Sequence, residues 1–241
     1  MGTDRIMNEW NVRRNWDQVS LRRKGGGYAI LLDRKPAKTP AGKELWLPAR
    51  QLAERVADEW RQTGKIDAGN MPWTRRANTA LDWVEPNRQE AVDAIAGYTE
   101  FELVCYRATQ PEELVRRQCG AWDPVLDWAG RRFGGELKVH SGVMPLPQPA
   151  DALRGLNARL QEMPAFELAG CGEMVTLSGS LLLALAALEG SISAEKAWRS
   201  ARIDEEWQVE HWGVDEEQLR IEDEHRKEFL AAAEFASLSR Q

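Results

Sequence analysis

Residues 28–40 read YAILLDRKPAKTP, and this stretch indicates the architecture of the N-terminal part of the chain. Its first five residues are apolar or aromatic, which is typical of a buried strand. The charged residues and prolines that follow are typical of a turn. We therefore expect a strand at Tyr28–Leu32 that enters a hairpin.

Two segments on either side of this strand have the same character. Val19–Leu21 and Leu45–Leu47 are short apolar runs, and glycines at 25–27 and residues 40–42 supply turn chemistry. The three consecutive glycines precede a strand rather than open a helix. A glycine hairpin is therefore favoured over a phosphate-binding loop.

An amphipathic helix is expected next, because Leu52, Val56 and Trp60 fall on one stripe of a helical wheel while charged residues occupy the other positions. Together with the strands, this helix predicts a small α+β domain over residues 1–85.

From residue 86 onward the pattern predicts only helices. Pro111 followed by two glutamates is typical of a helix start, and Asp123–Pro124 indicates either another start or a kink. Ser193 is expected to cap a helix that reaches Trp212. We therefore expect the fold class to be an α+β N-terminal domain followed by an all-α helical domain over residues 86–241.

Composition limits the classes of partner. The chain has 241 residues, a formal net charge of −6 and a pI near 5.3, which disfavours nucleic acid and anionic membranes as partners. Its three cysteines show no CxxC spacing, which favours a reducing compartment. The N-terminus lacks the apolar region of a secretory signal, and the longest apolar run, near Leu177–Leu188, is too short to span a bilayer. We expect a cytoplasmic protein without membrane insertion.

Motifs for catalysis are weak in this sequence. The histidines at 140, 211 and 225 form no HExxH pattern, no GxSxG is present, and nothing near Cys119 would activate its thiol. We expect no metal, no cofactor and no enzymatic activity.

The stretch DEEWQVEHWG, residues 204–213, combines four carboxylates with two tryptophans. On one continuous helix from Ser193, Glu205 and Gln208 would interrupt an apolar face that ends at Trp212. Glu205 is then either buried in a salt bridge to an arginine of another helix or an acidic anchor in a recessed docking surface. Trp207 would lie on the opposite face of this helix, where it is either packed against a neighbouring helix or exposed for contact with a partner.

Four motifs in this order resemble a known family: MPWTRRANTALDWV (71–84), LVCYRA (103–108), WDPVLDWA (122–129) and DEEWQVEHWG (204–213). They are similar to motifs of the assembly chaperones for the alpha subunit of the F-type ATP synthase head, called F1 complex assembly factor 2 in mitochondria. The resemblance covers roughly residues 16–235. It departs from the family in carrying Trp73 where leucine is usual.

The resemblance implies a chaperone that binds the unassembled alpha subunit, shields its interface from aggregation and releases it to the beta subunit. It implies no cofactor and no ATP hydrolysis, with relatives in alphaproteobacteria and in the mitochondrial matrix. It also implies two groups of residues. The partner-binding candidates are Asp204, Glu205, Glu206, Trp207, Gln208 and Trp212, and the fold-stabilising candidates are Trp60, Trp122 and Trp128.

Two other functions stay open at this point. One is a hydrolase that uses Glu205 or Glu206 as an acid or base, which requires a concave pocket and a shifted carboxylate. The other is a general protein-interaction scaffold. A monomer is expected, because no heptad seam persists along the chain.

Overall fold

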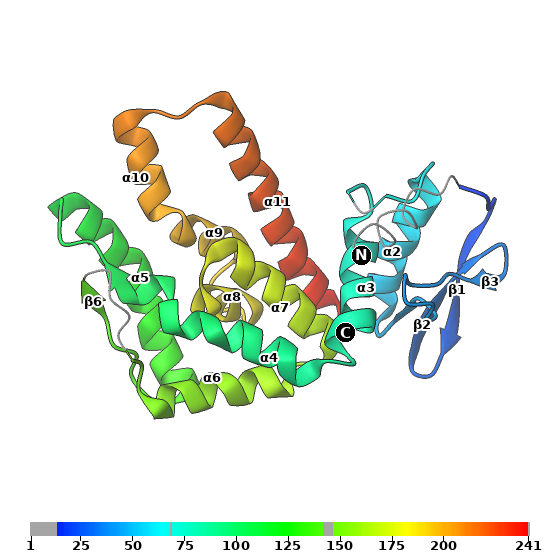
Figure 1. Ribbon diagram of the computed structural model, residues 1–241, viewed down its shortest axis with the longest axis horizontal. Coiled ribbons are helices and arrows are strands. Elements are labelled where there is room, and N and C mark those ends of the chain that lie inside the picture. Colours follow the sequence, from blue (N-terminus) through cyan, green and yellow to red (C-terminus); the bar gives the residue numbers. More distant parts are fainter. Residues whose placement is uncertain (1–13, 68, 142–146, 241) are drawn as a thin grey trace, which may run out of the picture. The chain divides into compact units, whose positions relative to one another are not determined.

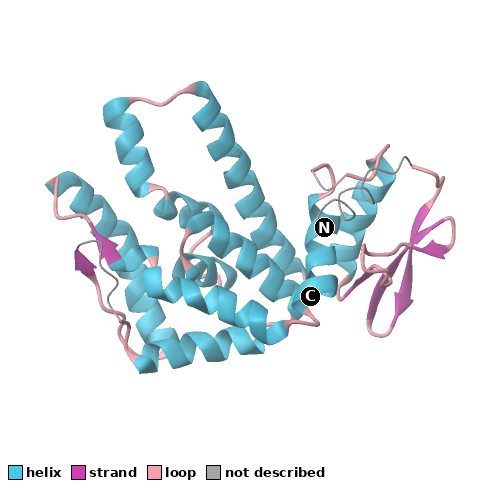
Figure 2. Cartoon of the chain, in the orientation of Figure 1, coloured by secondary structure: helices cyan, strands magenta, loops and turns pink. Residues whose placement is uncertain are grey.

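The computed structural model describes residues 14–67, 69–141 and 147–240 (Figure 1). The chain divides into two compact units. Unit 1 consists of residues 1–88, 164–170 and 235–241, and unit 2 consists of residues 89–163 and 171–234. The larger sheet lies in unit 1, whereas unit 2 is mostly helical (Figure 2). The predicted fold class is therefore confirmed, and the domain boundary after residue 85 stays a prediction.

Unit 1 contains a four-stranded antiparallel sheet. Strand β2 pairs with β1 on one side and with both β3 and β4 on the other. The strands are β1 (Val19–Lys24), β2 (Gly27–Leu32), β3 (Lys35–Pro36) and β4 (Trp46–Leu47). The expected strand at Tyr28–Leu32 is thus the central strand of this sheet.

Two tight turns set the register of β2. Gly25 and Gly26, with φ of +56° and +82°, connect β1 to β2, so the glycine hairpin is confirmed. Asp33 and Arg34 also have positive φ, and the Asp33 carboxylate accepts hydrogen bonds from the backbone of residues 17 and 18. At Gly27 a β-carbon would lie 2.4 Å from the carbonyl oxygen of Leu47, so the pairing with β4 requires glycine there.

Three helical segments cover the core of unit 1. They are α2 (Arg50–Gln62), α3 (Pro72–Thr79) and the π-helical segment η1 (Ala80–Val84). Helix α2 buries the predicted stripe, including Trp60, against the sheet residues Ile30 and Leu47. Helix α3 and η1 were not predicted. The Glu59 carboxylate of α2 accepts the N–H groups of Trp73 and Thr74 at the start of α3, at 2.7 and 2.8 Å.

Unit 2 is built from helices with one short parallel strand pair, β5 (Tyr106–Arg107) and β6 (His140–Ser141). Two of its helices, α7 (Ala165–Ser178) and α11 (Glu216–Leu238), also contribute residues to unit 1. The others are α4 (Arg88–Ala96), η2 (Gly97–Phe101), η3 (Leu103–Cys105), α5 (Glu112–Phe133), α6 (Ala150–Glu162), α8 (Leu181–Leu188), α9 (Ala194–Ala201) and α10 (Ile203–Trp212).

Pro111 is the N-cap of α5, with two glutamates in the first turn, as predicted. Pro124 lies inside α5, so of the two alternatives for Asp123–Pro124 the new helix start is wrong. The Asp123 carboxylate instead accepts a hydrogen bond from Arg107 at 2.7 Å.

The N-terminus of α8 is held by a buried carboxylate. Helix α8 is almost entirely apolar and buried, so its first N–H groups cannot reach water. Glu102, 1% exposed, accepts hydrogen bonds from the N–H groups of Leu181 and Leu182 and from the Ser180 hydroxyl. Burial raises the pKa of Glu102 to about 7.

In the described part of the chain, the helices are either too short or too polar to cross a membrane.

Candidate functional site

The segment expected to be one helix from Ser193 to Trp212 is two helices. Ser193 does cap α9, because its hydroxyl accepts the N–H of Lys196 at 3.1 Å. Helix α9 then ends, and Arg202, with φ of −110° and ψ of 11°, separates it from α10. Gly213 ends α10 as predicted, with φ of +76°. The prediction of one continuous helix is therefore wrong, because the helix is interrupted at Arg202.

The break changes which side of α10 is buried. Ile203 and Trp207 are its buried residues, whereas Glu205 is exposed. Glu205 forms an ion pair with Arg202, three residues earlier, at 3.1 Å. The interpretation of Glu205 as a buried residue paired with another helix is therefore wrong, because the wheel assumed an unbroken helical phase.

Asp204 connects two of the quoted motifs, 204–213 and 103–108, through Gln118. Its carboxylate accepts a hydrogen bond from the Gln118 amide nitrogen at 2.6 Å, and the Gln118 amide oxygen accepts the N–H of Ala108 at 2.9 Å. Gln118 is 1% exposed. One turn along α5, the Trp122 indole donates to the carbonyl of Ser200 at 2.7 Å. These contacts attach α10 and α9 to α5.

Trp207 is packed rather than displayed. It is 7% exposed, its ring stacks on His211 at 4.1 Å between centroids, and the Arg117 guanidinium lies 5.0 Å from its centroid. Arg117 also forms ion pairs with Glu210 and Glu113 at 2.8 and 2.9 Å. These hydrogen bonds raise the pKa of Arg117 and lower the pKa of Glu210. Trp207 thus belongs to the packing of α10 on α5.

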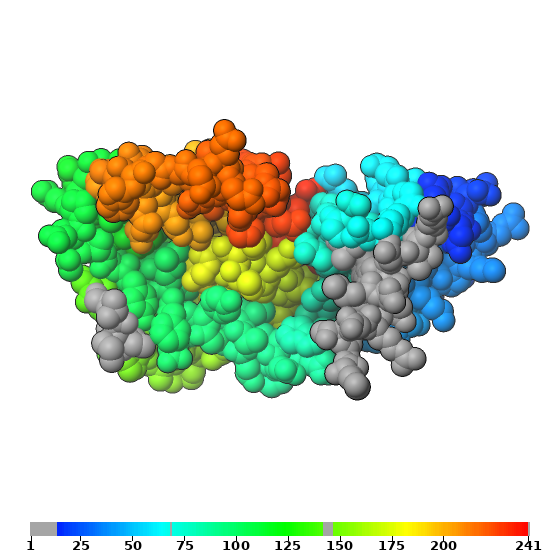
Figure 3. Space-filling model, turned by 45° about the horizontal axis from the view of Figure 1, so that its top comes forward, coloured from blue at the N-terminus to red at the C-terminus, as the bar shows by residue number. Residues whose placement is uncertain are grey.

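The other candidates on α10 face outward. Glu205, Glu206 and Gln208 are exposed, and Trp212 is 77% exposed, the highest value among the large apolar side chains of the described residues. The orange atoms of α10 and of the beginning of α11 lie on the surface of unit 2 (Figure 3). Of the six candidates, the structure therefore brings four to the surface and places Trp207 in the interior. Asp204 is half-buried.

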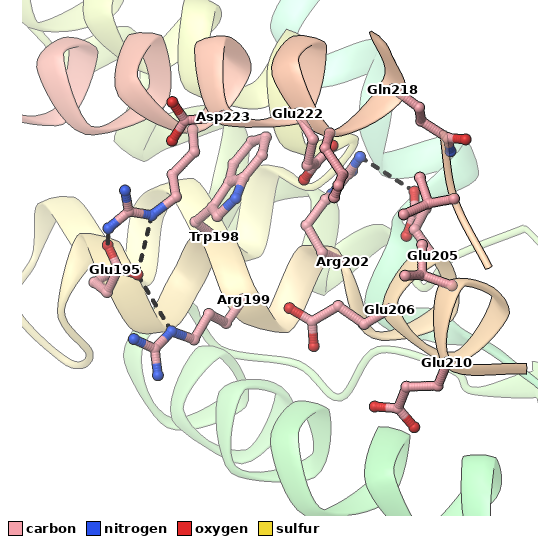
Figure 4. Close-up of a pocket in the computed structure, with 14 residues that line it drawn as sticks. Glu195, Trp198, Arg199, Arg202, Glu205, Glu206, Glu210, Gln218, Glu222 and Asp223 are labelled. Atoms are coloured by element: carbon pink, nitrogen blue, oxygen red, sulfur yellow. Dashed lines mark hydrogen bonds and ion pairs between the residues drawn. The ribbon is translucent and has the colours of Figure 1, made fainter. Parts of the chain in front are cut away.

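A groove of about 500 Å³ lies between α9 and α10 on one side and α11 on the other (Figure 4). Six carboxylates, three arginines, one glutamine and four apolar side chains line it. They are Glu195, Trp198, Arg199, Arg202, Glu205, Glu206, Val209, Glu210, Val214, Gln218, Leu219, Glu222, Asp223 and Arg226. The groove is therefore acidic with an apolar component.

The three tryptophans expected to stabilise the fold lie in different surroundings. Trp60 and Trp122 are 4% and 1% exposed, and the indole of Trp16 donates to the carbonyl of Trp60 at 3.2 Å. Trp128 is half-buried, with its ring edge-on to Phe133 at 5.3 Å. The burial of Trp60 and Trp122 supports the predicted role, which stays a prediction for all three.

Sequence reasoning missed Gln118, Arg117 and Glu222. Each is a single polar residue on a helix, and its role depends on a residue distant in sequence. No local pattern identifies such a pair. Within residues 14–67, 69–141 and 147–240, no three His, Cys, Asp or Glu side chains are grouped so that they could hold a metal ion.

A protein-family model described as "ATP12 chaperone protein" matches residues 13–130, and it defines the class of the molecule as a chaperone. The crystal structure of Atp12 from Paracoccus denitrificans is 38% identical with a TM-score of 0.89, and covers 94% of this chain and 98% of that chain. A crystal structure of an Agrobacterium tumefaciens protein is 38% identical with a TM-score of 0.88, and covers 95% of this chain and 86% of that chain. "Protein atp12, mitochondrial" of Schizosaccharomyces pombe is 22% identical over 240 aligned positions, which cover 94% of this chain and 82% of the relative.

The chain belongs to the ATP12 chaperone family. The family resemblance drawn from the four motifs is therefore confirmed.

Proposed function

We propose that this protein is a non-enzymatic assembly chaperone that binds the unassembled alpha subunit of the F-type ATP synthase head and releases it to the beta subunit. Membership of the ATP12 family supports the chaperone role. The observation that carries the proposal is the exposed acidic and aromatic surface of α10, namely Glu205, Glu206, Gln208 and Trp212.

This surface has the composition of a reversible protein-binding site. Trp212 is a large aromatic side chain held at the end of a helix, and aromatic anchors supply much of the binding energy at protein interfaces. The carboxylates around it are expected to increase the specificity and the rate of association with the partner more than the affinity. A chaperone needs this balance, because it must compete with aggregation and still yield to the beta subunit.

The hydrolase alternative has one observation in its favour, since Glu206 lies in a groove and has a raised pKa. The residues that line this groove include no serine, threonine, cysteine, tyrosine or histidine. Two carboxylates could act as acid and base, but Glu205 is paired with Arg202 and both Glu205 and Glu206 are exposed to solvent, so the chaperone function is the better supported one. We propose a cytoplasmic, monomeric protein.

The test is co-expression with the alpha subunit of the same organism, followed by size-exclusion chromatography of the soluble fraction. We expect a one-to-one complex that dissociates when the beta subunit is added. Trp212→Ala should reduce the amount of co-eluting alpha subunit. Trp83→Ala is the matched control, because Trp83 is also exposed, at 42%, but lies on η1 in unit 1.

Equal aggregation of the alpha subunit with and without the chaperone would contradict the proposal. Equal loss of complex in the two tryptophan variants would show that α10 is not the specific contact.

A further inference from the structure

The groove between α9 and α10 on one side and α11 on the other contains two carboxylates that form no ion pair. Glu206 points into it from α10 and Glu222 from α11 (Figure 4). Within the described part of the chain, neither side chain forms an ion pair or a hydrogen bond. Other carboxylates of the groove are neutralised locally.

All three arginines that line the groove are already paired. Arg199 and Arg226 both bind Glu195, at 3.2 and 2.7 Å, and Arg202 binds Glu205 at 3.1 Å. Two further carboxylates of the lining, Glu210 and Asp223, pair with Arg117 and Lys227, which lie outside it. Glu206 and Glu222 are therefore the two carboxylates of the lining that form no ion pair, while Arg199 and Arg226 share Glu195 and leave one positive charge in excess beside it.

These two charges are close enough to affect each other. Burial raises the pKa of Glu206. Among the nearby charges Arg199 has the largest effect and lowers this pKa, whereas Glu210 and Glu222 raise it and Arg117 lowers it. Two like charges in a partly desolvated groove cost free energy in the unbound protein. A cation placed between them would relieve that cost.

The same groove offers apolar surface for the rest of a bound segment. Trp198 is buried beneath it, Val209 and Val214 are half-buried, and Leu219 on α11 is 52% exposed. Trp212 is exposed on α10, three residues beyond Val209. Apolar surface rimmed by charge is typical of a site that binds a protein segment.

We propose that this groove binds an apolar segment of the unassembled alpha subunit that carries a lysine or an arginine, with the cationic group held between Glu206 and Glu222. The proposal rests on the proposed function and specifies the part of the partner that α10 and α11 recognise. A groove of about 500 Å³ accommodates a few side chains, so it is one portion of a larger interface.

The first test measures how fast the complex with the alpha subunit dissociates. Tagged chaperone is co-purified with the alpha subunit, an excess of untagged chaperone is added, and the alpha subunit that stays with the tag is followed over time. The double variant Glu206→Gln, Glu222→Gln should dissociate at least about tenfold faster, because a cation would lose both counter-charges. The matched control is Glu90→Gln, Glu112→Gln, which removes two exposed carboxylates of α4 and α5 outside the groove.

Folding does not confound this test. Because Glu206 and Glu222 repel each other, the double glutamine variant should have a thermal midpoint equal to or above that of the wild type. Unchanged dissociation in a folded double variant would overturn the proposal and leave the chaperone function standing. Failure of the wild-type protein to form any complex would instead contradict the proposed function itself.

The second test identifies the bound segment. A photo-crosslinking amino acid at position 219 should attach to one stretch of the alpha subunit, and mass spectrometry gives its sequence. We expect apolar residues with a lysine or an arginine. A crosslinked stretch without a basic residue, or no crosslink in a complex that forms normally, would overturn the proposal.

Discussion

Glu102 and Glu206 both have a pKa above the ordinary value of a glutamate, mainly because both are at least partly removed from water, but their surroundings differ. Around Glu102 the protein supplies donors, namely two backbone N–H groups of α8 and the Ser180 hydroxyl. Around Glu206 it supplies no hydrogen-bond donor but charges of both signs, with Arg199 and Arg117 lowering the pKa and Glu210 and Glu222 raising it. A raised pKa alone therefore does not identify a binding site, and the presence or absence of an internal partner separates the two cases.

The interior region is expected to tolerate change poorly. Trp122→Ala should lower the free energy of unfolding by about 3–5 kcal/mol, because it removes a fully buried aromatic side chain and its hydrogen bond to Ser200. Urea denaturation followed by circular dichroism measures this. A loss below about 1 kcal/mol would mean that unit 2 does not depend on this contact.

The second largest effect is expected at Glu102 itself. Glu102→Ala should cost about 2–4 kcal/mol, because the N–H groups of Leu181 and Leu182 would lose their acceptor in a region without water access. Glu102→Gln keeps one carbonyl oxygen and should cost less. If Glu102→Ala were as stable as the wild type, the hydrogen bonds of Glu102 would not stabilise the fold, and Glu102 would not differ from Glu206 in this respect.

The pH dependence of stability sharpens the same contrast. Glu102 keeps its proton up to about pH 7 in the folded state, whereas the unfolded chain releases it near 4.5. Its contribution to stability is therefore complete below pH 4.5 and is lost as the pH rises through about 7. The stability difference between the wild type and Glu102→Gln should accordingly fall between pH 4.5 and 7, as measured by urea midpoints at several pH values. A constant difference over this range would contradict the raised pKa.

The smallest effect is expected at the surface of α10. Glu205→Ala should change the free energy of unfolding by no more than about 0.5 kcal/mol, because the Glu205 side chain is exposed and its ion pair with Arg202 is therefore accessible to water. The helical content should stay the same, and retention of the alpha subunit should decrease. Loss of folding in this variant would indicate that Glu205 is buried and would contradict the structure.

Local sequence signals predicted the first part of the fold well. The hairpins around β2 follow from Gly25 and Gly26 and from the apolar run at Tyr28–Leu32, because turn residues and strand patterns are short-range features. The candidate surface was predicted less well. Arg202 carries no signal of a helix break, and yet its backbone conformation decides that Trp207 is buried and Glu205 exposed.

Contacts between residues distant in sequence could not be predicted either, because no local pattern indicates them. Glu102 lies in a short connection, 78 residues before its partner Ser180, and nothing in the intervening sequence indicates the contact. Glu206 and Glu222 likewise come from two helices whose relative position the sequence does not state. Such pairs depend on packing rather than on propensity.

The break at Arg202 also affects how an inserted residue would act on the surface of α10. In an unbroken helix, one inserted residue would rotate everything after it by about 100°. Because α9 ends at Ala201 and α10 starts afresh at Ile203, the backbone at Arg202 can absorb such a rotation before α10 begins. Arg202 is therefore a natural junction for chimeras, in which α10 of one relative is joined to the body of another.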